Sequence, residues 1–311
     1  MTTRPENDFW GDTSYRHERW IKMCGMETFK RNINFEYGQM AVFGMRDPKI
    51  KRIAWSLLKI GRLPVWGFNT HYDHHDTNGI RCRGWEFPGN EELDAYAFYC
   101  GLLYQYAKAV DPLWCLQLRE PNLGSPLPVY YKKNKYRARL ITQDMCMSTI
   151  ELSRIAKNIN LCDVKRVLEV GAGYGRMAWM ILELFPHIEY TIVDIEPALS
   201  VAKWYLEKTV QAKVNFLTPE ECRSRALPTQ DICINTSSFD EMPAEESIAY
   251  LGLFDGVCKD IVYLCGYGER RHPDTRLGLS QFNYPKAWKK VYQGTHPSIG
   301  GFQERVYKVN V

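Results

Sequence analysis

The stretch VLEVGAGYGRMAWMILELFPHIEYTIVD, residues 167–194, decides the fold of this chain. A short apolar run leads into three glycines, Gly171, Gly173 and Gly175. After them, apolar residues recur at the spacing of one helix face, and a second apolar run ends at Asp194. Glycine lets a backbone turn sharply, because it tolerates positive φ. The stretch therefore predicts a strand, a tight turn, a helix and a second strand.

The same alternation continues toward the end of the chain. The segment Thr218-Pro219-Glu220-Glu221 is typical of a capping box at a helix start. Strands that alternate with helices predict a Rossmann-like, doubly wound α/β sheet, so residues 141–311 are expected to form one domain. Its expected strands are 166–170, 190–194, 214–217, 231–235 and 261–265, with helices at 145–159, 176–185, from 197 onward and 244–257, and an antiparallel edge strand at 304–309.

Residues 1–140 differ in composition and pattern from the rest of the chain. Six of the nine tryptophans lie there. Helical patterns at 15–24, 48–60 and 91–110, separated by loops at 64–89 and 121–128, predict a mainly helical N-terminal region. Large aromatic side chains bury much apolar area, which is typical of a core or of a subunit interface. We expect this region to supply a substrate pocket, an oligomer interface or both, which leaves a homo-oligomer open.

Composition narrows the partners and the compartment. The 311 residues carry a formal net charge of +4, well short of the basic footprint of a nucleic-acid binder. The basic, tyrosine-containing run at 130–139 is interpreted as a solvated face. Ten cysteines without a C-x-x-C pair are typical of reduced thiols. With no apolar signal segment and no run of about 20 apolar residues, we expect a cytoplasmic protein with no membrane span and no nucleic-acid partner.

The glycine turn also indicates a cofactor. Dinucleotide-binding turns have the spacing G-x-G-x-x-G, which places pyrophosphate at a helix N-terminus, whereas this turn reads G-x-G-x-G. Glu169 precedes the first glycine by two residues, and its carboxylate would repel pyrophosphate. It suits a ligand with a cationic end, such as S-adenosylmethionine. Asp194, at the tip of the second strand, is placed to accept hydrogen bonds from ribose hydroxyls.

Two longer segments carry a resemblance to a known family, VLEVGAGYGRMAWMILELFPHIEYTIVDIEPAL and DICINTSSFDEMPAEESIAYL. The chain resembles the class I S-adenosylmethionine-dependent methyltransferases and, more narrowly, the sugar O-methyltransferase family of glycan and polysaccharide biosynthesis. Tyr174 in the turn, the N-T-x-S-F-x-E-M signature at 235–242 and the R-x-I-T-Q-like segment at 139–143 fit that family. The resemblance covers about half of the chain, from roughly residue 120 to residue 265.

The resemblance implies an O-methyltransferase that acts on a sugar hydroxyl and releases S-adenosylhomocysteine. The acceptor would be a sugar, a nucleotide sugar or an oligosaccharide, with residues 1–140 as the candidate acceptor pocket. By resemblance, the turn residues Glu169, Gly171, Gly173, Tyr174 and Gly175 would line the methionine part of the cofactor, and Asn235 would face the sulfonium. Asp194 and Ile195 would flank the ribose and adenine, with Leu217 and Thr218 near the adenine. Gln143 would reach the cofactor from the preceding segment.

Methyl transfer to a hydroxyl requires a group that removes its proton. Asp240 and Glu241 follow the fourth expected strand, and His272 follows the fifth. We prefer His272 as the base, because an imidazole titrates near neutral pH. His296 is a weaker candidate. A solvated loop position for His272 and a helix-entry role for Glu241 stay open as alternatives.

Substrate and metal contacts rest on weaker patterns. Arg270 and Arg271 are candidates for binding an acidic sugar or a phosphate, and Trp85 for stacking on a sugar. The cluster at 71–76 holds three histidines and two aspartates, but its spacing does not match well-attested metal sites. We therefore assign no metal ligand, and a divalent metal is not favoured.

Other functions stay open beside the sugar methyltransferase. One is a methyltransferase for a non-sugar small molecule or a protein. Another is a non-catalytic cofactor-binding subunit, which would keep the glycine turn without a proton acceptor. An NAD-dependent oxidoreductase is disfavoured by Glu169 and by the glycine spacing.

Overall fold

The computed structural model describes residues 14–15, 17–19, 21–22, 25–31, 68–69, 90–124, 126, 130–134, 137–269, 276–297 and 302–309. The chain divides into two compact units, Met1–Ile150 and Glu151–Val311. The helix expected at 48–60 lies outside the described residues. Of the helix expected at 15–24, the described positions between 14 and 22 are helical.

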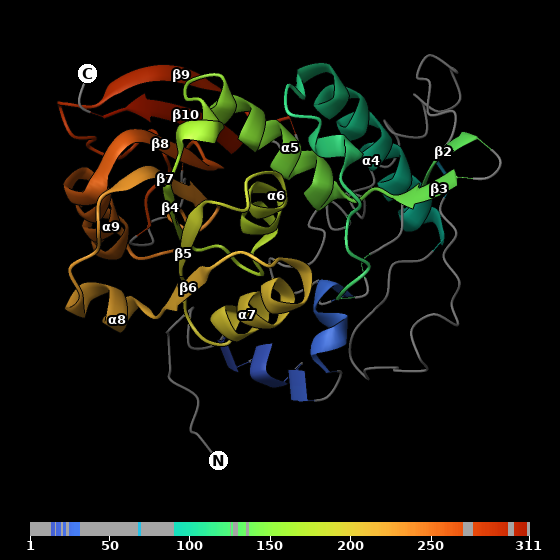
Figure 1. The fold of residues 1–311 in the computed structure, drawn as a ribbon, viewed down its shortest axis with the longest axis horizontal. Coiled ribbons are helices and arrows are strands. Elements are labelled where there is room, and N and C mark those ends of the chain that lie inside the picture. The colour runs from blue at the N-terminus through green and yellow to red at the C-terminus, as the bar shows by residue number, and fades with distance from the viewer. Residues whose placement is uncertain are drawn as a thin grey trace. The chain divides into compact units, whose positions relative to one another are not determined.

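The first unit contains helices and a small sheet (Figure 1). The long helix α4, Asn90–Val110, confirms the predicted helix, and the short 3-10 helices are η1, Met26–Arg31, and η2, Cys115–Gln117. The sheet was not expected. It pairs β1, Phe68–Asn69, with β2, Tyr130–Asn134, and β2 with β3, Arg137–Leu140, all antiparallel. The basic run interpreted as a solvated face therefore forms a β-hairpin, and β1 lies within the segment expected to be loop.

A buried ion pair anchors the described core of the first unit. Lys30 Nζ lies 3.7 Å from Glu120 Oε1, and neither side chain is more than 3% exposed. Glu120 also accepts hydrogen bonds from the Thr142 backbone N–H at 3.1 Å and from its hydroxyl at 2.6 Å. Burial raises the pKa of Glu120 to about 7 despite Lys30 and Thr142, which act to lower it. The pair joins η1 to the segment that leads into α5, Gln143–Ala156.

The second unit is built on a seven-stranded sheet in the order β6-β5-β4-β7-β8-β10-β9. Its first five strands along the chain are parallel, as the sequence predicts. Strands β4 and β6 and helix α9 have the predicted bounds, and the other predicted strands and helices differ at their ends. The elements are η3, Leu161–Asp163; β4, Arg166–Val170; α6, Arg176–Leu184; β5, Glu189–Val193; α7, Ala198–Thr209; β6, Val214–Leu217; α8, Pro219–Ser224; β7, Gln230–Thr236; α9, Ala244–Val257; β8, Cys258–Tyr267; β9, Lys289–Thr295; and β10, Phe302–Lys308.

The C-terminal strands correct one prediction. The strand expected at 304–309 is present as β10, but it is not an edge strand, because it pairs antiparallel with both β8 and β9. The edge on this side of the sheet is β9, which the sequence did not reveal. Every residue of β9 is exposed or half-buried, and the strand lacks the apolar alternation by which strands are recognised.

The strands of the second unit present different residues to two layers of helices. Figure 1 shows α8 and α9 on one side of the strands and α6 and α7 on the other. Alternate residues of a strand point to opposite faces, so Leu168 and Val170 share the apolar core with Phe254 of α9. Glu169, between them, belongs to the opposite face. The capping box predicted at Thr218 is present and starts α8.

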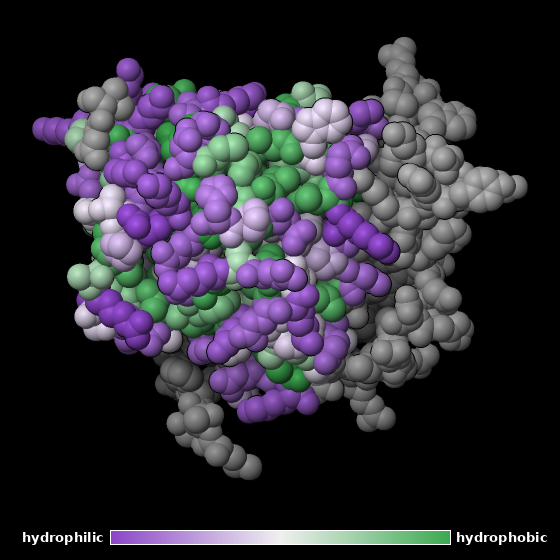
Figure 2. Space-filling view, in the orientation of Figure 1, coloured by the Kyte–Doolittle hydropathy of each residue, from purple (hydrophilic) through white to green (hydrophobic). Residues whose placement is uncertain are grey.

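The surface is mixed in character. The described residues on the face in Figure 2 are largely hydrophilic, with apolar groups scattered among them. In the part of the chain that the structure describes, no helix combines the length and hydropathy needed to cross a membrane.

Asp231 ties together the starts of three central strands. Its carboxylate, 3% exposed, accepts hydrogen bonds from the backbone N–H groups of Lys165 at 2.6 Å and Arg166 at 2.7 Å. Lys259, on β8, lies 2.6 Å from its other oxygen. Burial acts to raise the pKa of Asp231, but Lys259 and the two N–H groups outweigh it and hold the pKa below its usual range.

We predict that Asp231→Ala lowers the free energy of unfolding by about 3 kcal/mol, because two backbone donors and a lysine lose their acceptor. Urea unfolding measures this change. Asp260→Ala is the matched control, because Asp260 is exposed and lies 3.8 Å from the same lysine; it should cost no more than about 0.5 kcal/mol. Equal losses of unfolding free energy in the two variants would contradict the role of Asp231 in joining the three strands.

Candidate functional site

The glycine turn follows β4 at the point where the order of the parallel strands reverses. Strands β5 and β6 lie on one side of β4, and β7 and β8 lie on the other. Ligands of doubly wound sheets bind at such a point, beyond the carboxyl ends of the strands. Gly171, Gly173 and Gly175 have φ values of 74°, 59° and 86°, all in the left-handed region. The turn therefore requires glycine for its conformation, and Gly175 is the N-cap of α6.

The first glycine also makes room for a neighbouring side chain. A Cβ on Gly171 would collide with the Cβ and Oγ of Ser238. Ser238 Oγ donates to the carbonyl of Val170 at 3.2 Å. The end of β4 and the segment after β7 are thus packed against each other with no space for a methyl group.

Asn235, predicted to face the sulfonium, is fully buried at the end of β7. Its Nδ2 donates to Val170 O at 2.8 Å and to Ser238 Oγ, and its Oδ1 accepts from the Phe239 N–H at 3.2 Å. These contacts use the side chain to join β7 to β4. The N-T-x-S-F signature therefore has a structural function in holding the carboxyl edge of the sheet.

Asp194 holds the turn from the other side. Its Oδ2 accepts from the Gly173 N–H at 2.9 Å, and its Oδ1 accepts from the Ile195 N–H at 2.8 Å. The carboxylate predicted to bind ribose thus lies directly against the glycine turn. Because both groups are at the carboxyl edge, the structure brings together the two halves of the predicted cofactor site.

Glu169 is the buried acid of the site. It is 2% exposed, and its Oε2 accepts from the Tyr190 hydroxyl at 2.7 Å. Burial raises the pKa of Glu169 to about 7, although the Tyr190 hydrogen bond and Arg176 act to lower it. A carboxyl that titrates near neutral pH can gain its charge when a cation is bound beside it.

The remaining cofactor candidates make packing or capping contacts within the protein. The ring of Tyr174, 4% exposed, packs edge-on against Tyr205 of α7, with ring centroids 5.1 Å apart. Leu217 is buried, and Thr218 Oγ1 accepts from the Glu221 N–H at 3.2 Å as the cap of α8. Gln143 is the first residue of α5 in the first unit, where its Nε2 lies 3.2 Å from Met147 Sδ.

Of the catalytic candidates, Asp240, Glu241 and His296 are described. Asp240 is 1% exposed, and its Oδ2 accepts from the Tyr267 N–H at 3.3 Å, which joins the loop after β7 to the end of β8. Glu241 is buried beside it in sequence. His272, Arg270, Arg271 and Trp85 lie outside the described residues, as does the histidine cluster at 71–76.

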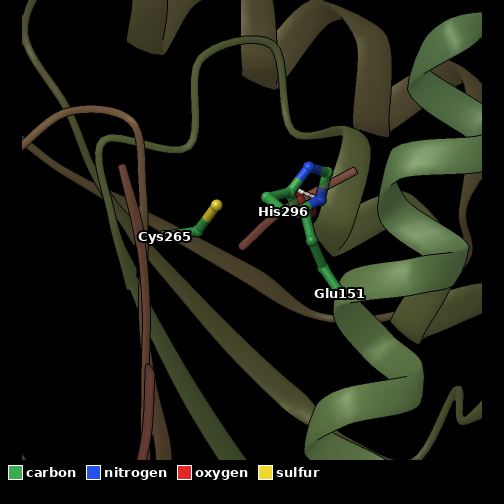
Figure 3. A group of neighbouring side chains, drawn as sticks. All are labelled: Glu151, Cys265 and His296. Atoms are coloured by element: carbon green, nitrogen blue, oxygen red, sulfur yellow. Dashed lines mark ion pairs between the residues drawn. The ribbon is translucent and has the colours of Figure 1, made fainter. Parts of the chain in front are cut away.

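The structure contains a buried polar cluster next to the sheet that the sequence did not predict. Glu151 of α5, Cys265 of β8 and His296 after β9 meet there (Figure 3), with candidate ligand atoms within 4.8 Å of one another. His296 Nε2 lies 3.6 Å from Glu151 Oε1. Glutamates within a helical pattern are usually solvated, so no local signal distinguished Glu151.

The cluster has the donor types of a zinc site, but its surroundings do not fit a divalent cation. Arg176 Nη1 and Nη2 lie 2.6 Å and 2.8 Å from the two oxygens of Glu151. Burial, followed by the nearby charges of Arg176 and Arg154, lowers the pKa of His296 to about 3. Two guanidinium groups would repel the ion, so the cluster is better described as a charge-paired buried network.

The sheet order, the antiparallel C-terminal pair and the glycine turn after β4 define the Rossmann-like fold of class I methyltransferases. The predicted fold class is thereby confirmed. Residues 123–241 match the model of the O-methyltransferase domain family. This match covers fewer than half of the residues of the chain.

Three solved structures illustrate the similarity. The mitomycin 7-O-methyltransferase MmcR is 11% identical, with a TM-score of 0.41 over 53% of this chain and 56% of its own. The magnesium protoporphyrin IX methyltransferase from Synechocystis PCC 6803 with bound SAH is 13% identical, with a TM-score of 0.41 over 54% and 83%. TehB from Haemophilus influenzae is 13% identical, with a TM-score of 0.43 over 51% and 62%. This chain thus spans just over half of the mitomycin enzyme. No curated protein sequence matches it.

We predict that Gly171→Ala destabilises the protein by about 3 kcal/mol, because the new methyl group needs both a strained backbone and the displacement of Ser238. The urea unfolding midpoint measures this loss. Gly252→Ala is the control, because Gly252 lies within α9 with no atom near the position of a Cβ. The control should gain roughly 0.5–1 kcal/mol. An unchanged midpoint for Gly171→Ala would contradict the close packing.

We predict that Glu169→Gln stabilises the protein without ligand at pH 8. The folded protein keeps the proton of Glu169 up to a pKa of about 7, so its contribution to stability falls as pH rises from about 4.5 to about 7. The neutral amide of the variant does not titrate, so this fall is absent. The free energy of unfolding of Glu169→Gln should exceed that of the wild type by about 2 kcal/mol at pH 8 and by little at pH 5. Thermal unfolding at both pH values tests this, with Glu207→Gln, an exposed site, as control. Equal shifts at the two pH values would contradict the assignment.

Proposed function

We propose that this chain is an S-adenosylmethionine-dependent O-methyltransferase that acts on a sugar hydroxyl in glycan or polysaccharide biosynthesis. The observation that carries the proposal is the glycine turn at the switch point, which Asp194 holds by a hydrogen bond to Gly173 and which the buried Glu169 precedes by two residues. The O-methyltransferase family match over 123–241 supports the reaction. The sugar acceptor rests on the sequence resemblance alone.

The residues at the carboxyl edge fit such a cofactor. Glu169 would face its cationic end and Asp194 its ribose, with Ile195, Leu217 and Thr218 beside the adenine. Thr236 Oγ1, at the end of β7, is a buried hydroxyl with no hydrogen-bond partner among the described residues. It shares a sheet face with Glu169, because Ile234 is the register partner of Glu169 and Thr236 lies two residues further on. We add Thr236 to the candidate cofactor contacts.

Bound S-adenosylmethionine would supply a methyl group activated by its sulfonium. The protein's part is to align the acceptor oxygen and to take its proton. His272 is the proposed base, with Asp240 and Glu241 as alternatives. Because Asp240 is 1% exposed and accepts from Tyr267, it is better suited to shaping the edge than to exchanging protons. Trp85, Arg270 and Arg271 are proposed to contact the acceptor.

The cofactor is tested by calorimetry with S-adenosylmethionine, S-adenosylhomocysteine and NAD. We predict binding of both sulfur compounds and none of NAD. Glu169→Gln should weaken the binding of S-adenosylhomocysteine about tenfold, because the loss of a charge-assisted contact costs about 1.5 kcal/mol or more. Binding of NAD alone would exclude the proposal.

The acceptor is tested with labelled S-adenosylmethionine and a panel of nucleotide sugars, oligosaccharides, phenols and proteins. Transfer to sugars is the expected result. Transfer only to phenols or protein would keep the methyltransferase and reject the sugar, and cofactor binding without any transfer would favour the non-catalytic subunit. His272→Ala should reduce turnover by about 100-fold or more while leaving cofactor affinity intact.

A further inference from the structure

The first residue of α6 carries a charge that does not suit its position. Arg176 follows Gly175, the N-cap of the helix, and no acidic residue lies in the first turn. A helix N-terminus has positive partial charge, so a cation there is unfavourable. The N-cap makes no side-chain hydrogen bond either. The start of this helix, directly after the glycine turn, therefore needs a partner from elsewhere.

Glu151 is that partner. Both of its carboxylate oxygens bind the guanidinium of Arg176, at 2.6 Å and 2.8 Å. The Glu151 side chain is fully buried, and that of Arg176 is 16% exposed. A bidentate pair fixes direction as well as distance, so it holds the first turn of α6 to α5 and restrains the turn before it.

A second carboxyl, that of Glu169, lies within electrostatic reach of the same arginine. The charge of Arg176 lowers the pKa of Glu169, and the charge of Glu151 raises it, so the three groups act on one another. Arg154 does not substitute for Arg176, because it lies 3.5 Å from Glu304 and over the ring of Tyr292. Tyr190, Arg176 and Asp194 act electrostatically on Glu169. The groups that Glu151 acts on or lies near are His296, Cys265, Tyr263 and Glu304.

We propose that Glu151 is a positioning residue for cofactor binding: it engages Arg176 and so keeps the carboxylate of Glu169 available to the cationic end of the cofactor. This inference rests on the proposed function. Without Glu151, the guanidinium turns to Glu169, forms an ion pair there and competes with the ligand. Glu151 thus acts through Arg176 and touches no reacting atom.

The test compares the binding of S-adenosylhomocysteine to the wild type, Glu151→Gln and the double variant Glu151→Gln/Arg176→Met by calorimetry at pH 6.5, 7.5 and 8.5. Glu151→Gln should weaken binding about tenfold, and the double variant should recover to within about threefold of the wild type, because no arginine is left to occupy Glu169. Glu189→Gln is the control. It breaks a partly exposed ion pair of similar length, 2.7 Å to Lys213, and should leave the affinity unchanged.

A second measurement needs no ligand. In the wild type, stability falls as pH rises through the raised pKa of Glu169, about 7. In Glu151→Gln, Arg176 pairs with Glu169 and lowers its pKa. The unfolding temperature should therefore fall less between pH 6 and pH 8 than it does in the wild type. If Glu151→Gln does not fold, Glu151→Asp takes its place, since the shorter acid cannot hold Arg176 in the same way.

The outcomes separate the two claims. A wild type that binds no S-adenosylhomocysteine overturns the proposed function, while the pH dependence without ligand still decides whether Glu151 restrains Arg176. A double variant that binds as weakly as Glu151→Gln shows that the pair only anchors the helix and overturns the inference. Unchanged affinity and unchanged pH dependence in Glu151→Gln also overturn it.

Discussion

The packing of Ser238 against Gly171 is the constraint on which the carboxyl edge of the sheet depends. The contact exists only because residue 171 has no side chain, and the same absence permits its left-handed φ. Asn235 then donates from Nδ2 to the Val170 carbonyl, while its Oδ1 accepts from the Phe239 N–H. This junction joins the ends of β4 and β7, so the part of the site between these strands is shaped by packing before any ligand enters.

Several buried ionisable side chains lie on or against the sheet face that carries Glu169. Glu151, Glu169 and Glu304 lie among two arginines and a neutral histidine. Such groups stabilise a fold poorly, because the loss of hydration offsets much of the attraction between them. The proposed function gives Glu169 and Glu151 a role in cofactor binding that is separate from fold stability.

The sequence was most informative where the signal is local. The apolar runs of β4 and β6, the bounds of α9 and the capping box at Thr218 depend on neighbouring residues, and each was predicted correctly. Strand β9 was missed because its half-exposed residues lack apolar alternation. The pairing of β10 with two strands and the pairing of Arg176 with Glu151 are set by residues far apart along the chain, so no local pattern distinguishes them.

The position of β9 at one border of the sheet bears on how copies of the chain can associate. Border strands offer unpaired backbone groups to any other strand. Lys289 and Lys290 stand exposed at the start of β9, and Lys290 Nζ contacts Gln293 Oε1 at 2.5 Å. Lysines on a border strand disfavour its pairing with another strand, so the charge of β9 opposes continuation of the sheet at this border.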